Sequence, residues 1–159
     1  MNIYLVSGKV HSGKTGKLML WVYKRPDARG VLAPVIEGKR YLMNVRTKTA
    51  RLLTADANDP NTVSVGDYRF SNETFEWGRQ ILQQAFSENA PWIVADEIGP
   101  LELNNQGLEP TISEWIAKSK NNDRINLVLV VRESLVEKVL QHFGLSRGQV
   151  KDFSFPLEP

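Results

Sequence analysis

Continuous apolar runs alternate along this chain with segments of helical spacing. Three short runs, at residues 3–6, 92–95 and 127–131, contain no charged residue. Such runs are typical of strands that are buried on both faces of a parallel sheet. Because helical segments separate them, the pattern predicts an α/β fold, a mainly parallel sheet with helices on both faces.

The helical spacing recurs in four segments, at residues 13–23, 71–87, 108–118 and 133–143. The first has apolar residues all round, Leu20 among them, so we expect it to be buried on more than one side. The third carries Thr111 and Glu114 at the spacing of a capping box, which predicts its first turn. A short tail with Phe153 and Phe155 is expected to add a final strand.

The middle of the chain changes to strand spacing. Residues 31–36, 41–45 and 50–53 are predicted to form three short strands of an antiparallel meander, inserted on the parallel core. Pro34 lacks the N–H group that a sheet requires, so we expect the first of these strands at an edge. Residues 54–67 are rich in Asp, Asn and Pro, which predicts a surface loop that could also act as a mobile lid.

The first apolar run leads directly into a phosphate-binding motif. Residues 8–15 match G-x-x-x-x-G-K-[ST] in full, between a predicted strand and a predicted helix. The backbone N–H groups of such a loop surround phosphate oxygens. We therefore expect Lys14 to reach the β- and γ-phosphates and the Thr15 hydroxyl to be a ligand of Mg²⁺. The expected nucleotide-binding residues are Gly8, Lys9, Val10, His11, Ser12, Gly13, Lys14, Thr15 and Gly16.

Two acidic residues follow the second apolar run. Asp96 is expected to hold Mg²⁺, directly or through water, and Glu97 to orient or deprotonate an attacking water molecule. Two adjacent carboxylates at the end of a buried strand are costly without a cation, which also favours a metal there. Taken without the phosphate loop, the same pair would indicate only a charged turn.

Arg132 follows the third apolar run and completes the predicted catalytic set with Lys14 and Glu97. From a strand end it would reach the γ-phosphate and stabilise the charge on the transferred phosphoryl group. The alternative is a surface arginine that pairs with Glu133 or Glu137. The two interpretations are about equally favoured.

Three further residues, Gly99, His11 and His142, are of types that can take part in such chemistry. The amide of Gly99 could contact the γ-phosphate, although a turn glycine before Pro100 is slightly favoured. His11 is the less favoured candidate for a general base, because the loop is expected to bind through its amides. His142 lies in an ordinary amphipathic segment and is expected to be structural.

Composition narrows the class of protein. The 159 residues, 42% of them hydrophobic, predict a single domain over residues 1–159. The chain has no cysteine and no apolar run of about 20 residues, so we expect a cytoplasmic protein that does not enter a membrane. The net charge of +2 is spread along the chain and gives no case for nucleic acid. The basic pairs at residues 24–25 and 39–40 are expected to be solvated.

The base of the nucleotide is not specified by the sequence. The tetrapeptide Asn-Lys-x-Asp of guanine-specific switches is missing, and residues 121–123 do not replace it. Aromatic and basic residues near the second predicted helix could stack on a base, although packing is the commoner role. These are Tyr68, Arg69, Phe70 and Trp77.

The segment at residues 94–103, together with the phosphate loop and residues 65–68, resembles the THEP-type nucleoside-triphosphatase family. The resemblance implies a P-loop NTPase, a three-layer sandwich with a RecA-like or kinase-like core. It also implies slow, Mg²⁺-dependent hydrolysis of nucleoside triphosphates with loose base selectivity. We expect ATP or GTP to be the nucleotide that is bound. Gly16 departs from the family, which usually has a hydroxyl residue there, and residues 9–11 replace smaller ones. Both departures imply weak activity.

Two other functions remain open beside hydrolysis. A small-molecule or nucleotide kinase would use the same core, with the meander and the loop at residues 54–67 closing over an acceptor. A nucleotide-gated binding module, similar to the guanine-nucleotide-binding adaptor of molybdenum-cofactor assembly, would bind nucleotide without turnover. Nothing in the sequence indicates a protein partner.

Overall fold

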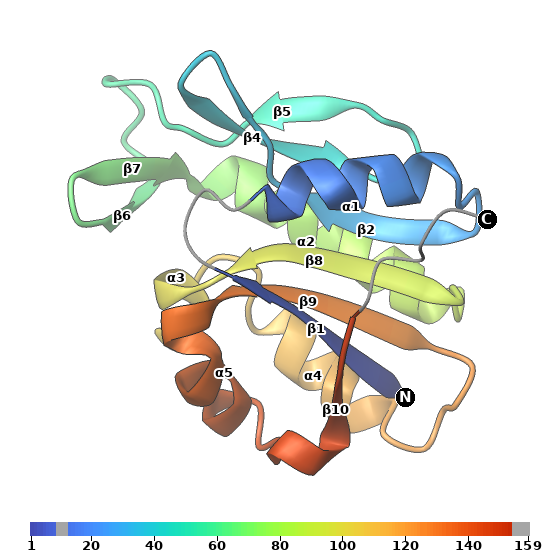
Figure 1. Cartoon of the computed structure of the whole chain (residues 1–159). Coiled ribbons are helices and arrows are strands. Elements are labelled where there is room, and N and C mark those ends of the chain that lie inside the picture. Colours follow the sequence, from blue (N-terminus) through green and yellow to red (C-terminus); the bar gives the residue numbers. More distant parts are fainter. Residues whose placement is uncertain (9–12, 154–159) are drawn as a thin grey trace.

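The computed structural model describes residues 1–8 and 13–153 of the chain. An eight-stranded sheet forms the centre, with the order β10-β1-β9-β8-β2-β4-β3 and with β5 paired to β4 (Figure 1). The parallel strands are β1 (Asn2–Gly8), β2 (Ala28–Leu32), β8 (Trp92–Ile98), β9 (Asn126–Arg132) and β10 (Val150–Asp152). The antiparallel strands are β3 (Val35–Ile36), β4 (Lys39–Asn44) and β5 (Ala50–Leu52).

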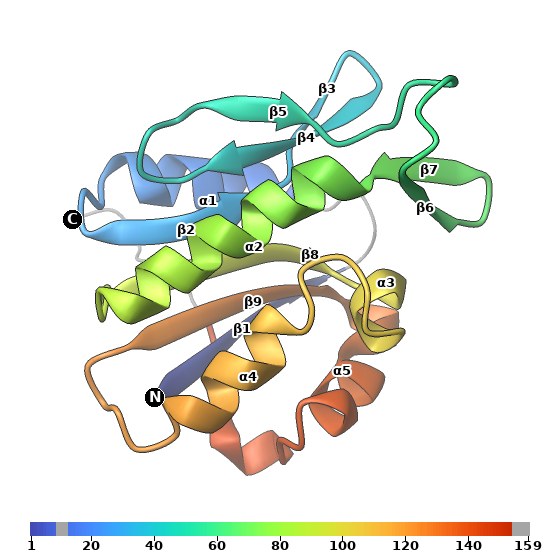
Figure 2. The same cartoon turned by 180° about the vertical axis from the view of Figure 1, so that it is seen from behind.

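Helices cover both faces of this sheet. On one face lies α1 (Lys14–Tyr23), which is in front of the sheet in Figure 1. On the other, seen in Figure 2, lie α2 (Asn72–Ser87), α4 (Thr111–Lys118) and α5 (Val136–His142). A short helix, α3 (Pro100–Leu103), follows β8. The three layers confirm the predicted fold class.

Each face of the sheet has its own apolar core. Leu18, Trp21 and Val22 of α1 pack on residues such as Val94 and Val130. The larger core on the opposite face joins the sheet to α2, α4 and α5. The side chains of a strand alternate between the faces, so β8 and β9 supply both cores, as their continuous apolar sequence predicted.

The segment predicted as one edge strand is divided between two strands: residues 31–32 end β2 inside the sheet, and residues 35–36 form β3 at its edge. β2 begins at Ala28 and pairs in parallel with β8 and antiparallel with β4, and Pro34 falls after the strand has ended. The parallel core therefore includes β2, and only β3 to β5 form the meander. Gly30 makes the close pairing possible: its φ is +110°, and a Cβ there would lie 2.1 Å from the Val94 carbonyl oxygen.

The segment predicted as a loop contains a strand. β6 (Thr62–Val65) forms a hairpin with β7 (Tyr68–Ser71), around a turn at Gly66, and this hairpin is a separate sheet. Arg69 ties the preceding loop to the hairpin through bonds to the carbonyl oxygens of Ala57 and Asp59. The Asp, Asn and Pro residues before β6 favoured the prediction of a loop, and a strand of only four residues was too short to alter it.

The helices differ in detail from the prediction. Leu20 is 69% exposed, so α1 is buried along one side only. Thr111 does not cap α4, which begins after Pro110. The Glu109 carboxylate instead accepts a bond from the Ser113 N–H, at 2.9 Å. The segment at residues 133–143 is a 3-10 turn followed by α5.

The predicted final strand is β10, at the end of the sheet beside β1. Phe153 follows it and packs against the rings of Tyr4, Trp21 and Trp92. Phe155 lies outside the described residues. In the part of the chain that the structure describes, no helix is long and apolar enough to cross a membrane.

Candidate functional site

The carboxyl ends of β1, β9 and β8 lie at one edge of the sheet and bring the predicted site residues to one place. Gly8 ends β1, Arg132 ends β9, and Asp96 and Glu97 lie near the end of β8. β9 lies between the other two strands. Ligands of parallel α/β sheets bind at such an edge, so the topology supports a single site.

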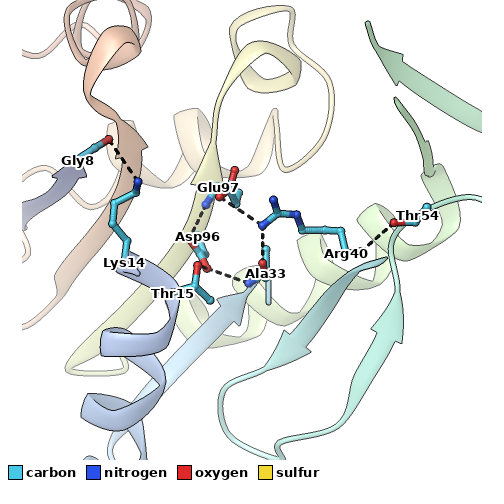
Figure 3. A network of polar contacts seen from close by, with 8 residues as sticks. All are labelled: Gly8, Lys14, Thr15, Ala33, Arg40, Thr54, Asp96 and Glu97. Carbon is cyan, nitrogen blue, oxygen red and sulfur yellow. Dashed lines mark hydrogen bonds and ion pairs between the residues drawn. The ribbon is translucent and has the colours of Figure 1, made fainter. Parts of the chain in front are cut away.

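The described residues of the phosphate loop are Gly8, at the end of β1, and residues 13–15, at the start of α1. Gly13 has φ of +81°, which glycine adopts at little cost, and Lys14 starts the helix. The Lys14 Nζ lies 3.3 Å from the Gly8 carbonyl oxygen, across the loop (Figure 3). Gly16 is exposed, and a Cβ there would meet no heavy atom within 4 Å. The predicted loop residues Lys9, Val10, His11 and Ser12 lie outside the described residues.

Thr15 and Asp96, distant in the sequence, are in direct contact. The Thr15 hydroxyl donates to Oδ2 of Asp96 at 2.8 Å. Two backbone N–H groups donate to the same carboxylate, that of Ala33 to Oδ2 at 2.9 Å and that of Glu97 to Oδ1 at 2.8 Å. The side chains predicted to hold Mg²⁺ therefore meet at the start of α1 (Figure 3).

Asp96 is 1% exposed, and this burial raises the pKa of its carboxyl group. The neighbouring Glu97 raises this pKa further, whereas the hydrogen bonds from Ala33, Thr15 and Glu97 lower it. A cation beside Asp96 would favour the charged form. The three donors fix the direction of the carboxylate before any ligand arrives.

Glu97 is turned out of the strand by a bulge. The pairing of β8 with β9 shifts in register between Ala95 and Ile98, and Glu97 has φ of +58°. A bulge re-aims a side chain, and positive φ in a residue other than glycine is uncommon and costs free energy. The Glu97 side chain is about one-third exposed and lies 3.3 Å from NH1 of Arg40.

Arg40 is a site residue that sequence reasoning missed. We predicted it to be solvated, but its side chain is only 24% exposed, and its guanidinium donates to the Ala33 carbonyl oxygen at 2.7 Å. It comes from β4, where Arg40 and the buried Leu42 share a face because side chains alternate along a strand. This alternation is the sequence feature that could have indicated an inward direction for Arg40. The partner carboxylate, Glu97, could not be foreseen.

A cavity of about 430 Å³ opens beside Glu97, and we call it the Glu97 cavity. Its walls come from β4, α2, α3, the β6–β7 hairpin, the ends of β8 and β9, and the residues just after β2 and β5. Its lining includes the charged side chains of Arg40, Asp96, Glu97 and Arg132, and apolar side chains such as those of Leu42 and Phe70.

Arg132 lies at this cavity and is exposed. Neither Glu133 nor Glu137 pairs with it in the described structure, and Glu137 instead contacts Arg147 at 3.9 Å. Of the four residues predicted as candidates to contact the base of a nucleotide, Tyr68 and Phe70 line the cavity. The other two have packing roles: Arg69 holds the loop before the hairpin, and Trp77 lies under the Arg51 guanidinium.

A comparison with protein-family models matches residues 4–153 to a family described as NTPase. The chain belongs to this NTPase family. Among solved structures, THEP1 from the hyperthermophile Aquifex aeolicus is similar, with 17% sequence identity and a TM-score of 0.71. The match covers 96% of this chain and 89% of that one, and it shows a shared P-loop NTPase fold. No curated protein sequence matches the chain.

The turn after β8 in the NTPase is organised by a buried acid, Glu102. Its carboxylate accepts bonds from the N–H groups of Gly99 at 2.9 Å and of Leu108 at 3.0 Å. Because its amide is used here, Gly99 fits the interpretation as a turn glycine. Gly107 packs against the same carboxylate, and a Cβ there would lie 2.0 Å from Oε2.

His142 also has a structural contact, as predicted. Its Nε2 lies 2.8 Å from Oε2 of Glu109, which is 3% exposed and precedes α4. This contact ties α5 to the start of α4. Ser113 binds the same carboxylate through its N–H and hydroxyl groups.

Burial raises the pKa of Glu102 from its ordinary value of 4.5 to about 7, although its hydrogen bonds oppose the change. The folded chain therefore holds this proton more tightly than the unfolded chain does. Stability from Glu102 is present at low pH and is lost as the pH rises through the folded pKa. We expect this group to lower the free energy of unfolding by about 2 kcal/mol between pH 5 and pH 8.

Urea unfolding of the wild-type chain and of Glu102→Gln at both pH values measures this effect. We expect Glu102→Gln to be the less stable at pH 5, because the amide cannot accept both bonds, and the deficit to shrink by about 2 kcal/mol at pH 8. Glu114→Gln, exposed on α4, is the matched control. An equal deficit at both pH values would contradict the raised pKa.

Proposed function

We propose that this NTPase hydrolyses nucleoside triphosphates to diphosphates and phosphate in a Mg²⁺-dependent reaction. The observation that carries the proposal is the 2.8 Å contact between the Thr15 hydroxyl and the buried Asp96 carboxylate. It joins the end of the phosphate-loop motif to the acidic strand end, and both groups offer the oxygen ligands that Mg²⁺ prefers. The donor set therefore fits this metal.

Thr15 and Asp96 are the residues that would hold Mg²⁺. When bound, the ion would neutralise charge on the β- and γ-phosphates. The protein's own part is the fixed carboxylate, which Ala33 and Glu97 orient through backbone bonds of 2.9 and 2.8 Å. Such preorganisation avoids rearrangement at the moment of reaction.

The remaining roles follow from charge and position. Lys14, across the loop from Gly8, would bind the β- and γ-phosphates, with the backbone amides of residues 8–16 around them. Glu97 would take a proton from the attacking water, and Arg40 beside it orients the carboxylate. Arg132, which has no ion-pair partner among the described residues, would stabilise charge on the transferred phosphoryl group.

We expect the enzyme to select only weakly among the bases of the nucleotide. The guanine-specific tetrapeptide is absent from the sequence. ATP and GTP are the first candidate substrates. Gly16 offers no hydroxyl to the α-phosphate, so we expect slow turnover, although packing would accept a side chain at this position.

Phosphate release from ATP, GTP, CTP and UTP tests the proposal directly. We expect release from all four, with rates within about tenfold of one another, because none of the described residues forms a recognisable base-selective site. Chelation of Mg²⁺ with EDTA should lower release at least about tenfold, since phosphate charge is then left uncompensated. Release of phosphate from one nucleotide alone would contradict the loose selectivity, and absence of release would contradict the function.

A further inference from the structure

We infer that the Glu97 cavity binds a second small molecule, a neutral ring compound of nucleoside size whose hydroxyl group accepts the γ-phosphoryl group. The NTPase would then also be a phosphotransferase. The inference rests on the proposed triphosphate site, because Glu97 serves both reactions. Four features of the cavity carry it: its position, its size, its walls and its charges.

The cavity lies on the far side of Asp96 from the phosphate loop. Figure 3 shows Gly8 and Lys14 on one side of Asp96 and Arg40 on the other. None of the described loop residues lines the cavity, whereas Arg40, Asp96 and Glu97 do. The attacking and leaving oxygens lie roughly in line in phosphoryl transfer. With the leaving diphosphate on the loop, the nucleophile approaches from the cavity.

The size of the cavity exceeds what hydrolysis requires. A water molecule occupies about 30 Å³, against about 430 Å³ here. Pockets of about 300–1,000 Å³ with apolar walls and a few polar groups are typical of small-molecule sites. The walls of this one include Leu42, Leu53, Phe70, Phe75 and Leu108. Apolar and aromatic walls suit a ring.

The charges around the cavity favour a neutral ligand. The carboxylates of Asp67 and Glu97 oppose the guanidinium groups of Arg40 and Arg132, and the other two acids, Asp96 and Glu102, are buried, so the cavity has no excess of positive charge for an anion. Arg40 is already engaged by Glu97 and by the Ala33 carbonyl oxygen. A phosphate or carboxylate on the ligand would meet Glu97, whereas a hydroxyl would find a base there.

The transfer step balances without a further reactant. The acceptor oxygen forms a bond to the γ-phosphorus, and the bond from that phosphorus to the oxygen of the β-phosphate breaks. The hydroxyl proton passes to the Glu97 carboxylate and then to solvent. The products are a nucleoside diphosphate and a phosphate monoester. Water in the same place gives hydrolysis.

The experiment follows labelled phosphate from ATP in the presence of Mg²⁺. The acceptors are adenosine, guanosine, cytidine, uridine and 2-naphthylmethanol, each tested separately with the full chain. The measured quantity is the ratio of label transferred to the acceptor to label released as free phosphate. We expect transfer to at least one compound, and the ratio to rise with its concentration.

Two variants and a control locate this transfer in the cavity. Val65→Trp puts an indole into it, so the ratio should fall at least tenfold. Ser64→Trp, at the preceding and exposed residue, should leave the ratio unchanged. Tyr68 is 71% exposed, so we expect Tyr68→Ala to fold like the wild-type chain and to raise the acceptor KM about fivefold through the lost ring contact.

The outcomes separate this inference from the proposed function. Hydrolysis by the wild-type chain without transfer to any of the five compounds overturns the inference. It does not contradict the proposed hydrolysis. A Val65→Trp chain with a raised KM for ATP overturns it too, because the cavity then holds the base of the triphosphate. A wild-type chain that neither hydrolyses nor transfers overturns both.

Discussion

Replacement of Lys14 by alanine should lower the affinity for nucleoside triphosphates about 100-fold. Lys14 starts α1, and its ammonium group spans the phosphate loop to the Gly8 carbonyl oxygen at 3.3 Å. In the proposed complex it binds the β- and γ-phosphates, and loss of one partner of a close charge pair costs about 2–5 kcal/mol. An affinity change of 100-fold corresponds to about 2.7 kcal/mol.

Isothermal titration with ATP and Mg²⁺ measures the change. Lys17→Ala is the matched control, because Lys17 lies one turn later on the same helix and is exposed. Thermal unfolding of each variant checks that the loss is not a loss of folding. Equal affinities of Lys14→Ala and Lys17→Ala for ATP would contradict the proposal that the phosphate loop binds the triphosphate.

Replacement of Glu97 by glutamine should preserve nucleotide affinity and lower the turnover rate by about 100-fold or more. The amide keeps the size of the side chain but cannot take a proton from the nucleophile, and a positioned general base contributes about 10²–10⁴-fold. The bulge in β8 is a backbone feature, so the direction of residue 97 should be retained. Single-turnover phosphate release and titration with ATP measure the two quantities separately.

The matched control for this variant is Glu76→Gln, which removes an exposed carboxylate on α2. Unchanged turnover in Glu97→Gln would show that Glu97 is not the general base, and that another group takes the proton. Tight binding with negligible turnover already in the wild-type chain would instead favour the nucleotide-gated binding module. Both results leave the phosphate loop in place, so they can be told apart from a failure at Lys14.

The parts of the site that could be foreseen are those that depend on local sequence. The match at residues 8–15 is local, and the apolar run before Asp96 identifies a buried strand that ends in acid. From these two features the contact between Thr15 and Asp96 could be expected. It follows from a general rule, because parallel strands bring their carboxyl ends to one edge of the sheet.

The missed residues depend on pairings between distant segments. Arg40 lies beside Glu97 only because β4 pairs with β2 and β2 with β8. The place of β2 inside the sheet depends on Gly30, whose role follows from the close approach of Val94. Glu102 belongs to the segment that carries the family resemblance, but its structural role could not be foreseen, since its partners are the backbone amides of Gly99 and Leu108 in folded turns.

The sequence by itself determined the α/β class, the phosphate loop, the acidic strand end and the resemblance to the NTPase family. Periodicity and motif are properties of neighbouring residues, and they survive in the linear chain. Only the tertiary structure decided where Glu97 points, that Arg40 accompanies it, and that a cavity opens beside them. Those features arise from a bulge and from strand pairings between segments far apart in the chain, which local sequence patterns do not reveal.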